Sequence, residues 1–240
     1  MLPFELWLNN IDSLHIFKML CCTNKEVRKY LVLLYPNHAA KTHLISLSQP
    51  WLPELYPHKA DAWRVHTLLQ QIKCRLHRML GNQTLPANPL VVTPRRAGKT
   101  ELVGTIAAAL LLSNRKVVVV ATCRRVASNI MRQCLELGAC GSRDPRDVPA
   151  NFIQHRDGWV QCCASGSASS SSIDTADVIL MDEAAYTPPE VIEMASGVQC
   201  TFMISTLTSE NNHFSRMCSN PAFNVVEAPT SPWAFVVRWE

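Results

Sequence analysis

Several features that would assign a protein to a common class are missing from this sequence of 240 residues. It has no apolar run of about 18 residues, the length that a membrane-spanning helix needs, and no secretory signal peptide at its start. We therefore expect no membrane association and a location inside the cell. The formal net charge is only +4, which is compatible with a nucleic-acid partner but too small to indicate one.

Spacings typical of structural zinc sites are also missing. The 10 cysteines are scattered along the chain, and no Cys-x-x-Cys pair with further ligands downstream occurs among them. Several cysteines lie within apolar runs, where a reduced thiol behaves as a small hydrophobic group. We therefore expect no structural zinc and a reducing compartment.

What the sequence does contain is the composition of a globular protein, with 48% hydrophobic and 18% charged residues. We expect residues 61–240 to form one domain and residues 1–60 to form a helical N-terminal extension. That extension includes Leu2-Pro3-x-Glu5-Leu6 and Lys25-x-x-Arg28-x-x-Leu31. The two patterns weakly resemble an F-box, a helical adaptor of ubiquitin ligases. The alternative, which we favour, is an extension that packs on the main domain.

Helical and strand patterns alternate along the main domain. Apolar spacing predicts helices over 61–80, 102–112 and 124–137. Apolar and β-branched runs predict strands over 90–92, 116–121, 178–181, 200–206 and 223–227, and a hairpin over 152–163 that turns at Asp157-Gly158. The serine-rich stretch 165–172 predicts a loop. The alternation as a whole predicts an α/β fold with a mainly parallel sheet flanked by helices.

The first candidate site follows the strand at 90–92. The chain breaks at Pro94 into a basic turn that ends in Gly98-Lys99-Thr100, and a helix begins at once. In such a loop the backbone N–H groups and the helix N-terminus face phosphates, the lysine reaches the β/γ oxygens and the threonine holds Mg²⁺. Thr93 stands at the motif's first glycine and Arg95-Arg96 fill its middle, so an ordinary turn is the alternative.

The second candidate site is the acid pair Asp182-Glu183 after the apolar run 178–181. Ligands bind at the carboxyl ends of strands in open α/β sheets. Asp182 is therefore placed to hold Mg²⁺ opposite Thr100, and Glu183 to orient and deprotonate an attacking water. The alternative is an acid pair that stabilises a helix N-terminus.

A third candidate is the pair of hydroxyls at Ser205 and Thr206, which end the strand over 200–206. If this strand lies beside the phosphate-loop strand, Ser205 or Thr206 lies near the γ-phosphate and can sense hydrolysis. A local hydroxyl cap of the strand end is the alternative. Together the three segments predict a P-loop NTPase fold of the ASCE type, with a mainly parallel sheet flanked by helices.

With these three segments, the chain resembles the ATPase domain of viral terminase large subunits, in particular the herpesvirus type. Its Pro94-Arg95-Arg96-Ala97-Gly98-Lys99-Thr100 has the Pro-Arg-Arg-x-Gly-Lys-Thr form of that family, and Asp182-Glu183-Ala184 follows a matching strand. Ile204-Ser205-Thr206 approximates the family's coupling strand, and the similarity covers about residues 85–228.

The resemblance implies a role for each matching residue and a set of ligands and partners. ATP and Mg²⁺ are the implied cofactors, with the nucleotide bound by the loop from Thr93 to Thr100. Lys99 would bind the phosphates, Thr100 and Asp182 the metal, and Glu183 would be the catalytic base. Arg95 or Arg96 would stabilise the negative charge that develops on the transferred phosphoryl group of the nucleotide bound to the same subunit. Ser205 and Thr206 would couple hydrolysis to DNA movement.

As a motor of this kind, the protein would move double-stranded DNA into capsids. It would act as a homo-oligomeric ring with other terminase subunits and the capsid portal, and its place would be the host nucleus if it is of the herpesvirus type. Two alternatives remain open. One is a helicase-like DNA-dependent ATPase, and the other is an adaptor or regulatory protein with a vestigial ATP site.

The sequence also departs from the terminase pattern. The segment 172–177 lacks the arginine-glycine pair often found before the carboxylate strand. No cluster of metal-binding acids follows the candidate ATPase residues before Glu240, so we predict no nuclease activity. A stand-alone motor, the product of one exon of a split gene and a divergent relative all fit this expectation.

Overall fold

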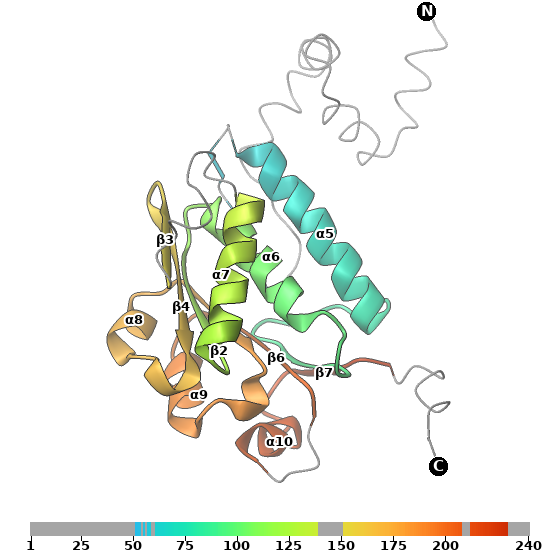
Figure 1. Ribbon diagram of the computed structural model, residues 1–240. Helices are drawn as coiled ribbons and strands as arrows, with labels where there is room; N and C mark the ends of the chain where they lie inside the picture. Colours follow the sequence, from blue (N-terminus) through green and yellow to red (C-terminus); the bar gives the residue numbers. More distant parts are fainter. Residues whose placement is uncertain are drawn as a thin grey trace, which may run out of the picture.

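The computed structural model describes residues 51–53, 55, 57–58, 61–138, 151–207 and 212–229 (Figure 1). The F-box-like patterns expected near the N-terminus lie outside these residues, as does most of the extension expected over 1–60. The elements in chain order are α5 (Ala62–Leu80), β1 (Leu90–Val92), α6 (Lys99–Leu111), β2 (Lys116–Ala121), α7 (Arg124–Gly138), β3 (Phe152–His155), β4 (Gly158–Ala164), the 3₁₀ turn η2 (Ser165–Ser167), α8 (Ser170–Asp174), β5 (Val178–Asp182), the 3₁₀ turn η3 (Ala184–Tyr186), α9 (Pro189–Ser196), β6 (Cys200–Ser205), α10 (His213–Cys218) and β7 (Val225–Glu227). Among these helices, none combines the length and the apolar character that crossing a membrane requires.

The strands form one seven-stranded sheet in the order β3-β4-β2-β5-β6-β1-β7. Every neighbouring pair is parallel except β3 and β4, which form the antiparallel hairpin. The mainly parallel α/β sheet is therefore confirmed. Strand β6 lies between β1 and β5, so one additional strand separates the phosphate-loop strand from the carboxylate strand. This order is that of the ASCE type of P-loop NTPase.

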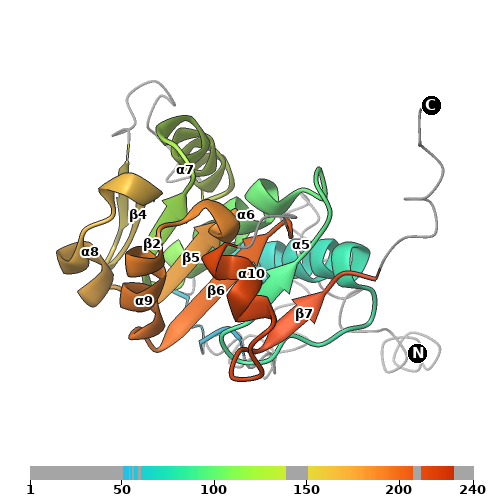
Figure 2. The same ribbon diagram turned by 90° about the horizontal axis from the view of Figure 1, so that it is seen from below.

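Helices cover both faces of the sheet (Figures 1 and 2). Alternate residues of a strand point to opposite faces, and β2 shows this directly. Val117 and Val119 pack in a core cluster with α5, α6 and α7, whereas Val118 and Val120 pack in a second cluster with α8, α9 and α10. Burial on both faces explains why β2 is a continuous β-branched run.

The residues just before α5 belong to the same core. The rings of Trp51 and Phe202 lie 5.3 Å apart, and the thiol of Cys200 donates to the Trp51 carbonyl at 3.3 Å. Leu55 is buried in this cluster as well. The chain is thus fixed to β6 before the helix that leads to the phosphate loop begins.

The hairpin turns one residue earlier than the sequence predicted. Its two turn residues are Arg156 and Asp157, with Arg156 at φ 54°, while Gly158 already pairs with His155 as the first residue of β4. A Cβ on Gly158 would lie 2.8 Å from backbone atoms of Asn114. The glycine is therefore required by the close approach of a neighbouring chain segment and not by the turn.

The expected loop over the serine-rich stretch was wrong, because residues 165–174 form η2 and the short helix α8. Ile173 is fully buried among residues of the second core cluster and holds α8 to the sheet. Serine and threonine hydroxyls also satisfy groups within the turn, as in the bond from Thr175 Oγ1 to the Ser171 carbonyl at 3.2 Å. The buried Ile173 and these local hydrogen bonds together hold the segment.

Replacing Gly158 by alanine should lower the free energy of unfolding by about 1–3 kcal/mol, because the new methyl group meets rigid backbone. Gly166→Ala is the matched control, since a Cβ at Gly166 would meet nothing within 4 Å and its φ is not positive. Chemical denaturation of both variants measures the difference. Equal stability of the two variants would contradict the proposed close contact.

Candidate active site

The loop from Thr93 to Gly98 connects the end of β1 to the start of α6. Gly98 has φ 87° and ψ 27°, a left-handed conformation that glycine adopts without strain. Its carbonyl accepts the Leu102 N–H at 3.0 Å as the helix begins. The first N–H groups of a helix have no partner within it, so this terminus favours an anion.

Side chains from two neighbouring helices hold the first turn of α6. Arg75 of α5 forms an ion pair with Glu101, and Gln133 of α7 donates to the Glu101 carbonyl at 2.8 Å. Met79 of α5 approaches the loop itself, since its Cε would lie 3.6 Å from a Cβ on Gly98. No pattern in the sequence indicates these contacts. They fix the helix terminus whose N–H groups face the candidate phosphate position.

Thr100 and Asp182 meet at the candidate metal position. The Thr100 hydroxyl donates to Asp182 Oδ2 at 2.6 Å, while Oδ1 is buried with no hydrogen-bond partner among the described residues. Asp182 is the last residue of β5 and is fully buried. Burial raises the pKa of its carboxyl and the Glu183 charge raises it further, while the Thr100 hydrogen bond opposes the shift. A buried carboxylate oxygen without a partner beside a hydroxyl fits the oxygen ligands that Mg²⁺ prefers.

Lys99 lies at the centre of the site with its side chain 5% exposed. Its ammonium lies 3.1 Å from Glu183 Oε1 and donates to Thr206 Oγ1 at 2.7 Å and to the Pro94 carbonyl at 3.2 Å. Three oxygens therefore surround a buried cation. A phosphate oxygen is a fourth acceptor of the same kind, and it can replace one of these three.

The other oxygen of Glu183 is also held. Oε2 accepts from the Ser205 hydroxyl at 3.1 Å and from the Thr206 N–H at 3.2 Å. Ser205 pairs with Val92 across β6 and β1, and its carbonyl accepts the Thr93 N–H at 2.9 Å. The structure thus places the predicted strand beside the phosphate-loop strand and brings its two hydroxyl residues to the glutamate.

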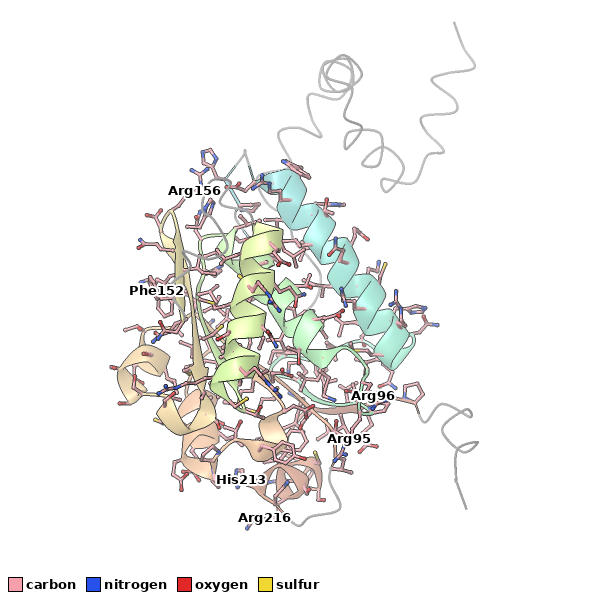
Figure 3. All side chains as sticks on the ribbon, viewed as in Figure 1. Arg95, Arg96, Phe152, Arg156, His213 and Arg216 are labelled. Carbon is pink, nitrogen blue, oxygen red and sulfur yellow. The ribbon has the colours of Figure 1, made fainter. Side chains whose placement is uncertain are left out.

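The two arginines of the loop lie apart from this cluster. Both are exposed, and within the described part of the chain neither guanidinium makes a hydrogen bond or ion pair with Lys99, Asp182 or Glu183. Figure 3 shows Arg95 and Arg96 at the end of the molecule where α10 carries His213 and Arg216. Arg96 has a left-handed backbone, with φ 63°.

Thr93 fills the position of the motif's first glycine. It is 2% exposed, and its hydroxyl has no hydrogen-bond partner among the residues described. The site therefore contains two buried oxygens without partners in the described part of the chain, this one and Asp182 Oδ1. Ala97 and Gly98, which complete the loop, are half-buried.

Replacing Asp182 by asparagine should leave the metal-free protein at least as stable as the wild type at pH 7. The carboxyl pKa is raised in the folded state, so ionisation disfavours folding above its unfolded pKa, and this cost disappears as pH falls towards that value. Thermal unfolding between pH 4 and pH 7 measures the trend. A variant that is less stable than the wild type at pH 7, or whose stability relative to the wild type falls between pH 4 and pH 7, would contradict it.

One family of known proteins matches the part of the chain that contains this site. The model of the helicase domain of the RNA cytidine acetyltransferase NAT10/TcmA matches residues 90–210, half of the chain. No curated protein matches. Among solved structures, the large terminase ATPase domain of Thermus phage P74-26 is 14% identical, with 64% of this chain and 79% of that chain covered and a TM-score of 0.44.

Two further solved structures are similar at the same low level. The large terminase of a thermophilic bacteriophage in complex with ADP is 16% identical over 50% of this chain and 33% of its own, with a TM-score of 0.36. UvsW of T4 is 13% identical over 71% and 33%, with a TM-score of 0.35. The family match over residues 90–210 contains every candidate site residue, from Thr93 to Thr206. The chain belongs to the family of the NAT10/TcmA helicase domain.

Proposed function

We propose that this protein is a Mg²⁺-dependent ATPase whose hydrolysis drives movement along a nucleic acid. The observation that carries the proposal is the contact of Lys99 with both Glu183 and Thr206 within one buried cluster. That cluster joins the phosphate loop, the carboxylate strand and the strand between them. Next to it, Thr100 and Asp182 supply the oxygens that would hold the metal ion.

Each residue then has one task. Lys99 would bind the β/γ-phosphates, and a Mg²⁺ ion held by Thr100 and Asp182 would supply further positive charge there. Glu183 orients the attacking water and accepts its proton. Because Lys99 contacts Glu183 and can contact a phosphate instead, nucleotide binding exchanges one partner of the ammonium for another. The carboxylate is thereby released towards the water when the triphosphate is in place.

The coupling role falls to β6. Thr206 donates its N–H to Glu183 and accepts from Lys99 through its hydroxyl, so it contacts both groups that change partners during turnover. Ser205 joins the same carboxylate to the turn after β5. Loss of the γ-phosphate would therefore act first on the end of β6.

A motor needs a contact with its polymer, and exposed arginines are found on the phosphate loop and on α10. Arg95, Arg96 and Arg216 are exposed at one end of the molecule (Figure 3), where a phosphodiester backbone can be bound. In the terminase form of this proposal, that polymer is double-stranded DNA, moved into a capsid by a ring of subunits docked on a portal. Arg95 or Arg96 would then act on the phosphoryl group when the loop closes on ATP.

A second form of the proposal is an RNA-acting helicase-type ATPase. The family match favours it, because the matching model describes the helicase domain of an RNA cytidine acetyltransferase. Both forms share the hydrolytic site and differ in the polymer. An adaptor with a vestigial site is disfavoured, because Lys99, Thr100, Asp182 and Glu183 are all present and in contact.

ATP turnover by the purified protein tests the shared site. Lys99→Ala should abolish nucleotide binding, and Glu183→Gln should retain binding but lose roughly a hundredfold or more in rate, because the general base is gone. Lys73→Ala and Glu193→Gln are matched controls, since both residues are exposed on other helices. Failure of the wild type to bind ATP with Mg²⁺ would refute the proposal.

The same assay with duplex DNA or structured RNA added distinguishes the two forms. Stimulation by duplex DNA alone supports the packaging form, and stimulation by RNA alone supports the helicase-type form. Turnover that neither polymer changes would leave an ATPase and refute the motor.

Arg216→Gln should weaken the stimulating polymer's binding and reduce the slope of its salt dependence by about 1, because one phosphate contact is lost. Turnover without polymer should be unchanged. Arg78→Gln, an exposed arginine on α5, is the control and should bind like the wild type. An Arg216 variant with unaltered affinity and salt slope would exclude α10 from the polymer contact.

A further inference from the structure

The turn η3 directly follows Glu183 and determines where its carboxylate points. Glu183 has φ 55° and ψ 52°, a left-handed conformation that is unfavourable for a residue with a side chain. The Tyr186 N–H closes the turn on the Glu183 carbonyl at 3.0 Å. A strained backbone of this kind persists only when its surroundings hold it.

Ala185, two residues after Glu183, is held from both sides. Its N–H donates to the Ser205 hydroxyl at 3.1 Å, and its carbonyl accepts from Asn212 Nδ2 at 3.3 Å. The turn is thus clamped between the end of β6 and the residue that precedes α10. Ser205 belongs to the candidate site already described, whereas Asn212 does not.

The side-chain oxygen of Asn212 caps the N-terminus of α10. Its Oδ1 accepts the Ser215 N–H at 2.8 Å, which makes it the N-cap of the helix. Phe214 and Met217 are buried and fix α10 to the second core cluster. The amide therefore joins an anchored helix to the turn after Glu183. Asparagine suits both tasks, because its side chain accepts with one atom and donates with the other.

We propose that Asn212 is a positioning residue for Glu183. By donating to the Ala185 carbonyl, it keeps the turn in the conformation that presents the carboxylate to Ser205, Thr206 and the attacking water. The proposal rests on the function proposed above, in which Glu183 is the general base. A capping role alone accounts for the bond to Ser215 but not for the bond to Ala185, and the two roles are separable by substitution.

Asn212→Asp and Asn212→Ser separate them. Aspartate and serine both cap helices, so thermal stability should stay close to that of the wild type. Aspartate cannot donate to the Ala185 carbonyl, and serine is too short to reach it. We expect kcat to fall by about 10- to 100-fold in both variants, as for other small displacements of catalytic groups, with ATP affinity unchanged. Asn212→Ala should lower kcat as well and also lower the Tm by about 2–4 °C, because the cap is lost.

Asn220→Ser is the matched control. Asn220 also accepts a backbone N–H through its side chain, from Ala222 at 3.0 Å, but it bonds to no residue of the turn among those described. It should hydrolyse ATP at the wild-type rate.

The remaining outcomes each decide the question. Wild-type kcat in both the aspartate and the serine variants overturns the proposal and leaves the ATPase standing. Loss of rate in the aspartate variant alone also overturns it, since the added charge would then be the cause. A fall in kcat that follows the Tm across the three variants assigns Asn212 to capping only. If the wild type does not hydrolyse ATP, the proposed roles of Glu183 as base and of Asn212 as positioning residue are both refuted.

Discussion

The contact between the buried ammonium of Lys99 and the carboxylate of Glu183 is the interaction on which the rest of the site depends. A cation that is 5% exposed must have acceptors close by, and each of its acceptors comes from a different segment. Pro94 lies in the phosphate loop, Glu183 follows β5 and Thr206 follows β6. The strand order β5-β6-β1 is what brings these three segments to one point.

The same arrangement explains where the backbone is unusual. Gly98 and Glu183 both have positive φ. Gly98 immediately precedes Lys99 in the chain, and Glu183 pairs with the Lys99 ammonium. Glycine adopts this conformation freely, but glutamate does so at a cost, which the bonds to both carboxylate oxygens offset. Around them, α5, α7 and α10 supply contacts that prevent the strained segments from relaxing. The geometry of the candidate site is thus a property of the whole layer arrangement.

The sequence predicted the parts of the site that have local patterns. Strands that end in Val92, Asp182 and Ser205 are apolar runs followed by polar residues, so their common edge could be inferred. From the expected neighbouring strands, the sequence predicted that Ser205 or Thr206 would lie near the γ-phosphate. The contact between Lys99 and Thr206, which are 107 residues apart, was not itself predicted. Met79 against the loop and Asn212 against η3 have no such pattern, because single contacts between distant segments leave no periodic signal. The predicted position of the hairpin turn was wrong for a similar reason. Gly158 is required by its close contact with the distant Asn114 and not by the conformation of the turn.

The hydrolytic chemistry proposed for this site does not depend on which polymer the proposed motor would move. In the proposed function Lys99, Thr100, Asp182 and Glu183 would bind phosphates, a metal ion and water, and a helicase-type and a terminase-type motor would need the same four groups. Selectivity for DNA or RNA must therefore come from surfaces outside the cluster that are mechanically joined to it. Helix α10 meets that condition, since it carries the exposed Arg216 and is bonded through Asn212 to the turn that follows Glu183. A polymer that displaces this helix would act on Glu183 through two hydrogen bonds of one side chain.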